Sequence, residues 1–172
     1  NTRLLFENNI KFEHVTAGKL RRYFSVFNII DLFKTGWGTI TALWKLYRIY
    51  PDVVFSKGAY ASFPVLLTAK LLKIPVMIHE SDSRPGRVNA WSGKFSKRVA
   101  LSYPDALAYF TRGNAAVTGN PIRRDIARPT ANGAYEFFRF TPDLPVLLIM
   151  GGSQGAGVIN DTLVDILPAL VE

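Results

Sequence analysis

The sequence has no cysteine and only two histidines, His14 and His79. Without cysteine the chain can form neither a disulfide nor a thiolate site, which fits a reducing compartment. The two histidines lie far apart and give no metal-ligand spacing, so we expect no metal site. No apolar run approaches 18 residues, and we therefore expect no segment that spans a bilayer. These absences argue against a disulfide scaffold, a zinc domain and a membrane-spanning helix.

Acidic residues are scarce relative to basic ones. The chain carries 21 Lys and Arg against 13 Asp and Glu, a formal net charge of +8. This balance indicates an anionic partner, which would be nucleic acid, a phosphorylated substrate or an anionic membrane surface. Residues 19–48 hold six basic residues and one acid, Asp31, and so contribute +5 of the net charge. Much of the excess is therefore concentrated in one segment.

The same segment is rich in aromatic residues. Four apolar residues recur there at the spacing of one helical face, namely Trp37, Ile40, Trp44 and Tyr47. Packing of this face on the domain core is one interpretation. A lipid-facing patch is the other, because aromatic rings among cations are typical of membrane-binding surfaces. We expect such a patch to contain Arg21, Arg22, Phe24, Trp37 and Trp44. No stacking or groove-reading motif accompanies it, which argues against nucleic acid.

After residue 50 the pattern alternates between strands and helices. Apolar runs predict strands at 52–56, 75–79, 98–102 and 115–118, with helices at 64–73, 87–94 and 104–110. This order of elements indicates an α/β fold with a Rossmann-like, doubly wound parallel sheet. Residues 11–15 alternate in polarity and predict a further strand.

Proline and glycine interrupt this pattern after residue 120. We expect residues 1–120 to form a partial N-terminal domain, 121–143 an interdomain connection, and 144–172 the beginning of a C-terminal domain. Asn1 is not an initiator methionine, and residues 2–7 look like the tail of a helix. We therefore interpret the chain as an internal fragment.

Two glycine-bearing loops follow predicted strands. Residues 57–62 follow the strand at 52–56, and residues 151–156 follow the apolar run 146–150, which predicts a buried strand. Glycine lets a ligand approach backbone amides at a helix N-terminus, so the loop 151–156 is a candidate phosphate site. A packing turn that needs small residues is the alternative. The Gly-x-Gly-x-x-Gly spacing of dinucleotide sites is not met at 151–156, which disfavours a nicotinamide-dependent oxidoreductase.

Polar residues also follow the predicted strand at 75–79. In an open parallel sheet the carboxyl ends of the strands face the ligand crevice. By that rule the loop 57–62 and the segment 79–82 are site candidates on one edge of the sheet. The alternative for Glu80 and Asp82 is that they cap the next helix or bond loop amides.

Four segments together resemble the MurG family of N-acetylglucosaminyltransferases. Their motifs are Ser-Lys-Gly-Ala-Tyr at 56–60, His-Glu-Ser-Asp at 79–82, Gly-Asn-Pro-Ile-Arg at 119–123 and Gly-Gly-Ser-Gln-Gly at 151–155. The resemblance covers nearly the whole chain. It implies a GT-B fold with only the start of the second Rossmann-like domain present. It also implies inverting transfer of N-acetylglucosamine from UDP-N-acetylglucosamine to lipid I, forming lipid II for peptidoglycan, without a metal or a cofactor.

The resemblance implies roles for individual residues as well. Contacts with the donor fall on Asp82, Arg123, Gly152, Ser153 and Gln154. Contacts with the acceptor and its diphosphate fall on Gly58, Ala59, Tyr60, Ser62, His79 and Glu80. The proposed catalytic base, a histidine, would precede Asn1. The implied partners are UDP-N-acetylglucosamine, lipid I and an anionic membrane surface, with no nucleic acid, at the cytoplasmic face of the bacterial cell membrane.

Two positions depart from the usual pattern of the family. Asp82 stands where asparagine is common, and a carboxylate there would repel phosphate. Ala59 stands where glycine is usual; if that position needs a positive φ, alanine costs about 1–2 kcal/mol. Two alternative functions stay open, which are a related GT-B enzyme with another lipid acceptor and a non-catalytic, membrane-binding module.

Overall fold

The computed structural model describes residues 2–18, 27–128, 130, 132–141, 143–152 and 155–171. It divides into two compact units, Asn1–Ile122 and Arg123–Glu172. The first unit holds the sheet, and the second holds short helices and one longer helix. The finer division at residues 120 and 143 stays a prediction.

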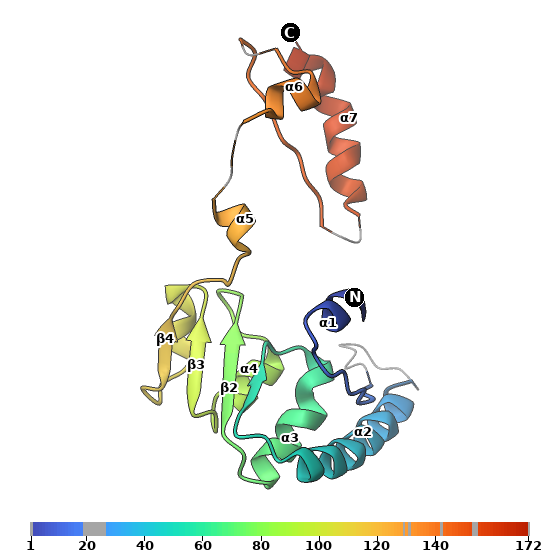
Figure 1. The fold of residues 1–172 in the computed structure, drawn as a ribbon, viewed down its shortest axis with the longest axis vertical. Coiled ribbons are helices and arrows are strands. Elements are labelled where there is room, and N and C mark those ends of the chain that lie inside the picture. The colour runs from blue at the N-terminus through green and yellow to red at the C-terminus, as the bar shows by residue number, and fades with distance from the viewer. Residues whose placement is uncertain are drawn as a thin grey trace. The chain divides into compact units, whose positions relative to one another are not determined.

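The first unit contains a four-stranded parallel sheet in the order β1-β2-β3-β4 (Figure 1). Its strands are β1 (Val54–Ser56), β2 (Val76–Glu80), β3 (Arg98–Leu101) and β4 (Ala115–Val117). Between them lie α3 (Phe63–Leu71), α4 (Arg87–Ser92) and the 3₁₀ turns η1 (Tyr60–Ser62) and η2 (Pro104–Tyr109). The alternation of strands and helices predicted for residues 52–118 is confirmed. Each crossover is helical because parallel neighbours need a long connection.

The core of this unit lies between the sheet and α3. Leu66 of α3, Ile78 of β2 and Leu101 of β3 are fully buried. Pro64 occupies the first turn of α3, where its missing N–H would have no helical partner in any case. Lys73 follows α3 with φ +57° and reverses the chain into β2. The packed core therefore fixes the ends of β1 and β2, from which the candidate site is built.

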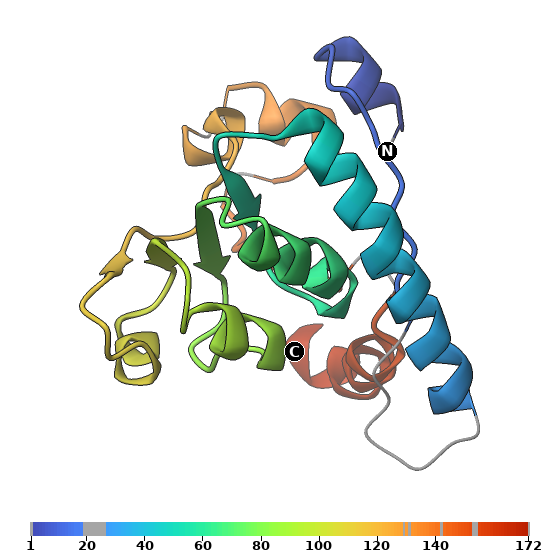
Figure 2. The same cartoon turned by 90° about the horizontal axis from the view of Figure 1, so that it is seen from below.

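Helix α2 (Phe27–Ile49) packs along α3 with an unusual choice of side chains (Figures 1 and 2). Its buried face consists of Asp31, Thr35, Gly38, Ala42 and Leu46. The four residues at helical spacing, Trp37, Ile40, Trp44 and Tyr47, are all largely exposed. The interpretation that these four side chains pack on the domain core is therefore wrong. The small residues let α2 approach α3 closely, and the large apolar residues point outward.

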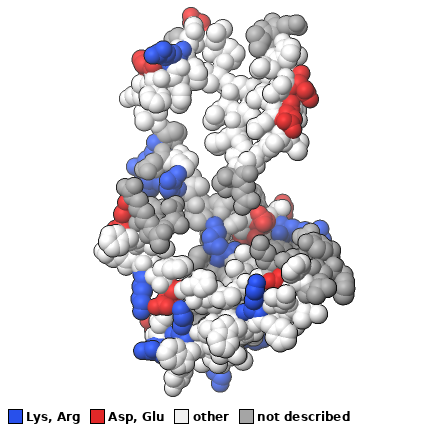
Figure 3. Space-filling view, turned by 90° about the vertical axis from the view of Figure 1, so that its right-hand side faces the viewer, with Lys and Arg blue, Asp and Glu red and all other residues white. Residues whose placement is uncertain are grey.

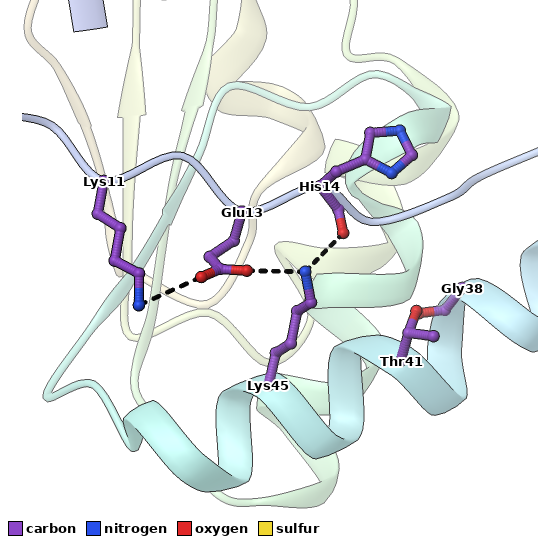
Figure 4. Close-up of polar contacts among 6 residues, drawn as sticks. All are labelled: Lys11, Glu13, His14, Gly38, Thr41 and Lys45. Atoms are coloured by element: carbon purple, nitrogen blue, oxygen red, sulfur yellow. Dashed lines mark hydrogen bonds and ion pairs between the residues drawn. The ribbon is translucent and has the colours of Figure 1, made fainter. Parts of the chain in front are cut away.

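Residues 11–15 form no strand, so the prediction of a strand there is wrong. Alternating polarity provides a face but not a neighbouring strand to pair with. Lys45 on α2 instead donates to the carbonyl of His14 at 2.9 Å and to Glu13 Oε2 at 2.8 Å (Figure 4). A Cβ at Gly38 would collide with the carbonyl oxygen of Thr16, so only glycine permits this crossing.

Glu13 lies between two cations, Lys45 and Lys11, whose Nζ atoms are 2.8 and 3.2 Å from its carboxylate oxygens (Figure 4). Hydrogen bonding from Lys45, and then from Lys11, holds the pKa of Glu13 below its ordinary value. The ionised carboxylate therefore ties residues 11–15 to α2. Helix α1 (Thr2–Glu7), which precedes this segment, agrees with the predicted helix tail.

The second unit contains α5 (Arg124–Ala127), α6 (Ala134–Phe138) and α7 (Gly157–Val171). The prediction of a buried strand at residues 146–150 is wrong, because this run is irregular and Leu148 is 79% exposed. A parallel strand needs a paired neighbour and cover on both faces. The part of this unit that the structure describes provides no such neighbour. Among the described residues of the whole chain, no helix is both long and apolar enough to cross a membrane.

Candidate active site

Two loops leave the sheet side by side at its carboxyl edge. β1 ends at Ser56 and pairs there with Ile78 of β2, which ends at Glu80 two residues later. Because the two strands are parallel neighbours, the loop 57–62 and the segment 81–86 start from the same edge. The structure thus confirms that the glycine loop and the residues after β2 share one edge of the sheet.

The glycine loop has a strained backbone at two successive residues. Gly58 has φ +88°, and Ala59 has φ +66° with ψ +156°, a region that non-glycine residues rarely occupy. The Gly58 N–H donates to Ser56 Oγ at 3.1 Å, and Ser62 Oγ donates to the Ala59 carbonyl at 2.8 Å. The positive φ considered for position 59 is therefore present. These hydrogen bonds hold the turn with Ala59 exposed.

Tyr60 connects the glycine loop to the helical layer. Its ring stacks on Phe63 with centroids 5.9 Å apart and an interplanar angle of 4°. Its hydroxyl lies 3.4 Å from Thr35 Oγ1 on the buried face of α2. The Thr35 hydroxyl donates to the Asp31 carbonyl at 2.7 Å and accepts from Gly18 N–H at 3.2 Å. Tyr60 is thus held by packing and is half-buried.

Glu80 is only 3% exposed, and both of its carboxylate oxygens are used within the protein. Oε1 accepts the Asp82 N–H at 3.0 Å, and Oε2 accepts the Gly86 N–H at 3.0 Å. These bonds confirm the alternative that an acid after the strand binds loop amides. An ionised carboxylate gives stronger hydrogen bonds than a neutral acceptor, so Glu80 fixes the segment 81–86 on the sheet edge. A direct contact of Glu80 with the acceptor stays a prediction.

His79 is also 3% exposed and joins β2 to the end of the sheet. Its Nε2 lies 3.1 Å from the Gly119 carbonyl, which can only accept, so Nε2 carries the hydrogen. Ser81 Oγ lies 3.5 Å from Nδ1, on the opposite side of the ring. His79 therefore holds the Gly119 turn, which follows β4 and leads to the second unit.

Asn89 also belongs to this edge, although no motif in the sequence indicated it. It lies in α4 and is 3% exposed, and its Nδ2 donates to Glu80 Oε2 at 3.0 Å and to the His79 carbonyl at 3.3 Å. A Cβ built on Gly58 would lie 2.7 Å from the same amide nitrogen. An inward-facing asparagine among the apolar residues of α4 was the available signal, but its partners are distant in sequence.

The residues predicted to contact the donor are distributed over both units. Asp82 has an exposed side chain in the first unit, whereas Arg123 and Gly152 are exposed in the second. Ser153 and Gln154 lie outside the described residues. Around them, the Gly155 N–H donates to the Gly152 carbonyl at 3.0 Å and α7 begins at Gly157, as the predicted turn into a helix requires. Their assembly with Asp82 into one donor site stays a prediction.

Two residues of the predicted membrane patch, Trp37 and Trp44, lie on the exposed face of α2. Trp37 and Trp44 are 64% and 62% exposed, and the Arg48 guanidinium stacks over the Trp44 ring at 4.6 Å. An apolar groove of about 640 Å³ runs beside Trp37 and Ile40 towards Phe63. The face drawn in Figure 3 shows mostly uncharged side chains, with scattered Lys and Arg and a few Asp and Glu. Arg21, Arg22 and Phe24 lie outside the described residues.

Comparison with known proteins gives consistent matches over nearly the whole chain. The family model for the glycosyltransferase family 28 N-terminal domain matches residues 1–101. A protein from Lachnospira eligens is 38% identical over 169 residues, which are 98% of this chain and 48% of that protein. One from Staphylococcus saprophyticus is 41% identical over 95% of this chain and 46% of its own length. Both are named UDP-N-acetylglucosamine–N-acetylmuramyl-(pentapeptide) pyrophosphoryl-undecaprenol N-acetylglucosamine transferase.

A protein from Legionella pneumophila with the same name is 43% identical over 90% of this chain and 43% of its own length. The crystal structure of Acinetobacter baumannii MurG superposes with a TM-score of 0.54 at 28% identity, covering 74% of this chain and 35% of that one. The chain spans about half the length of the curated relatives that it matches. The similarity therefore includes the fold of the parallel sheet.

Proposed function

Because the chain belongs to the glycosyltransferase family 28 N-terminal domain family, we propose that it is part of an N-acetylglucosaminyltransferase of peptidoglycan synthesis. The reaction transfers N-acetylglucosamine from UDP-N-acetylglucosamine to lipid I, the pyrophosphoryl-undecaprenol acceptor, and forms lipid II. One observation carries the proposal, namely 38–43% identity over 90–98% of the chain to enzymes named for this transfer. In chemical terms, an acceptor hydroxyl oxygen attacks the anomeric carbon, UDP leaves with the electron pair of the broken bond, and a base takes the hydroxyl proton.

The carboxyl edge of the sheet is the proposed acceptor side. Exposed Ala59 and half-buried Gly58 offer backbone to an anionic group without large side chains. Tyr60 and Ser62 complete this loop, while His79 and Glu80 lie behind it and hold the strand ends. A diphosphate needs compact hydrogen-bond donors in a fixed place, and the exposed backbone at Ala59 lies in a turn that hydrogen bonds hold on the packed sheet. We assign the diphosphate of lipid I to this edge.

The donor is assigned to Asp82, Arg123 and the turn at Gly152, together with Ser153 and Gln154. A guanidinium suits the negative charge that develops on UDP as the glycosidic bond breaks. Arg123 is exposed at the start of the second unit and precedes α5, which leaves its side chain available for such a contact. The mechanism requires neither a metal nor an organic cofactor from the protein.

We also assign α2 to contact with an anionic membrane, at the cytoplasmic face where UDP-sugars occur. The exposed face of this helix carries Trp37 and Trp44, with Lys34, Lys45 and Arg48 on the same helix. Aromatic rings at headgroup depth and cations near anionic lipid each favour binding of such a helix parallel to the surface. A lipid-linked acceptor would then reach the sheet edge without leaving the bilayer.

Replacement of Arg123 tests the assignment of the donor diphosphate. In the full-length enzyme we expect Arg123→Ala to lower kcat by about 10²–10³-fold, because a charge-stabilising donor is lost. UDP release with saturating lipid I analogue measures this effect, and the neighbouring exposed variant Arg124→Ala serves as the control. Near-wild-type turnover of Arg123→Ala would remove Arg123 from the donor site. Absence of acceptor-dependent UDP release from the wild-type protein would contradict the proposed function itself.

A further inference from the structure

Asn89 occupies the space between the two loops at the carboxyl edge of the sheet. It comes from α4 and is 3% exposed, so its amide has been withdrawn from water. Its Nδ2 reaches the carboxylate of Glu80 at 3.0 Å and the carbonyl of His79 at 3.3 Å. One side chain therefore touches the end of β2 and the carboxylate that holds the segment 81–86.

The orientation of this amide follows from its partners. The two atoms beside Nδ2 are a carboxylate oxygen and a carbonyl oxygen, and both can only accept a hydrogen bond when Glu80 is ionised. The amide nitrogen must face them, so a flipped amide is excluded. Oδ1 is buried without a hydrogen-bond partner among the described residues. A buried polar atom without a partner is costly, which is expected at a functional site more than in a purely structural core.

Asn89 also lies directly against the glycine loop. A Cβ at Gly58 would lie 2.7 Å from Nδ2, 2.8 Å from Oδ1 and 2.9 Å from Cγ of Asn89. The Asn89 amide thus fills the space that a side chain at position 58 would occupy. The same loop has positive φ at Gly58 and Ala59. A strained turn of this kind persists only where its surroundings hold it in place.

We propose that Asn89 is a positioning residue for the glycine loop 57–62, with its amide clamped by Glu80 and packed against Gly58. Glu80 holds the segment 81–86 through the N–H groups of Asp82 and Gly86, and it holds Asn89 through Oε2. Asn89 then transmits this fixed geometry to Gly58 by contact. The two loops at the carboxyl edge are thereby set relative to each other by one carboxylate and one amide.

The catalytic consequence of this inference rests on the proposed function, because it assumes that the loop 57–62 receives the diphosphate of the acceptor. Misplacement of a binding group by about 1 Å can cost on the order of 10²-fold in rate. We therefore expect Asn89→Ala in the full-length enzyme to lower kcat/KM for a lipid I analogue by about 10- to 100-fold. The KM for UDP-N-acetylglucosamine should change less, because Glu80 Oε1 still accepts the Asp82 N–H in this variant.

Hydrogen exchange in the full-length protein tests the positioning role without any need for activity. We expect Asn89→Ala to speed exchange at Gly58 and Ser62, whose N–H groups form hydrogen bonds within the strained turn. Exchange in α3 should be unchanged, which separates a local effect from global unfolding. The milder variant Asn89→Ser gives the same comparison if Asn89→Ala does not fold. Unchanged exchange in the loop of a folded variant would overturn the proposal.

A double-mutant cycle between Gly58 and Asn89 tests the contact itself. Gly58→Ala introduces both a left-handed alanine and a collision with Asn89, whereas Gly113→Ala, at φ +70° with open space around it, introduces only the former. We expect Gly58→Ala to speed loop exchange and to lower acceptor kcat/KM far less in the Asn89→Ala background than in the wild type. If Gly58→Ala changes loop exchange and kcat/KM by the same factor in both backgrounds, the two residues act independently and the proposal is overturned. Coupled exchange in a protein without transferase activity would contradict the proposed function and support the positioning role.

Discussion

At the scale of single residues, Ala59 holds a backbone conformation that carries a structural cost. Its φ of +66° and ψ of +156° lie in a region that is nearly exclusive to glycine. This strained conformation persists because the Ser62 hydroxyl donates a hydrogen bond to the Ala59 carbonyl and because Gly58 packs against Asn89. The sequence indicated that Ala59 replaces a glycine, but the sign of φ at that position could be known only from the turn itself.

Replacement of Ala59 by glycine should stabilise the full-length protein. Relief of the backbone strain contributes roughly 1–3 kcal/mol, and the added freedom of glycine in the unfolded chain offsets roughly 0.4–1 kcal/mol of that. We expect a net gain of about 1 kcal/mol in the free energy of unfolding. Chemical denaturation measures it, with Ala61→Gly, at an exposed position without positive φ, as a control that should destabilise. A loss of stability in Ala59→Gly would show that the turn is not strained.

Glu13 provides a residue-scale prediction that depends on pH. Because Lys45 and Lys11 lower its pKa in the folded protein, its ion pairs stabilise the fold above the pKa of an unfolded glutamate. This contribution is lost as the pH falls through the lowered pKa. We expect Lys45→Met to raise the pKa of Glu13 towards its ordinary value, as measured by carbon-detected NMR titration. Lys34→Met, on the same helix, serves as the control, and an unchanged pKa in Lys45→Met would contradict the pairing.

At the scale of elements, α2 shows the limit of a periodicity argument. The spacing of Trp37, Ile40 and Trp44 correctly indicated a helix with an apolar face. It did not reveal which face packs, because small residues such as Gly38 and Ala42 bury little surface yet allow the closest approach to the rest of the unit. The strands from β1 to β4 were predictable since each apolar run meets a paired neighbour. The runs at 11–15 and 146–150 have no such neighbour among the described residues and form no strand.

The exposed face of α2 should bind anionic vesicles. We expect Trp37→Ala combined with Trp44→Ala to weaken binding of the full-length protein by about tenfold or more, because two large apolar side chains no longer enter the lipid. Binding of the wild type should also weaken with salt as the cations are screened. Vesicle sedimentation measures both effects, with Phe137→Ala, an exposed aromatic residue of α6, as the control. Equal loss in the control would show that the effect is not specific to α2.

At the scale of the whole molecule, the fold is more predictable than the site. The parallel sheet and the edge that carries the loops followed from residues 52–118, where pattern and tertiary environment agree. Asn89 did not follow, because its partners Glu80 and Gly58 lie 9 and 31 residues away in the chain and only folding brings them together. Donor contacts at Arg123 and Gly152 belong to the second unit, so their relation to Asp82 is a prediction about the assembled enzyme.

We infer that this chain is part of an enzyme that glycosylates a lipid diphosphate. Transfer of radiolabelled N-acetylglucosamine from UDP-N-acetylglucosamine to a lipid I analogue by the full-length gene product tests this inference. We expect label in the lipid product only when both the enzyme and the diphosphate-bearing acceptor are present. A folded full-length protein that leaves all label in the nucleotide sugar, at saturating acceptor in anionic lipid, would contradict the claim.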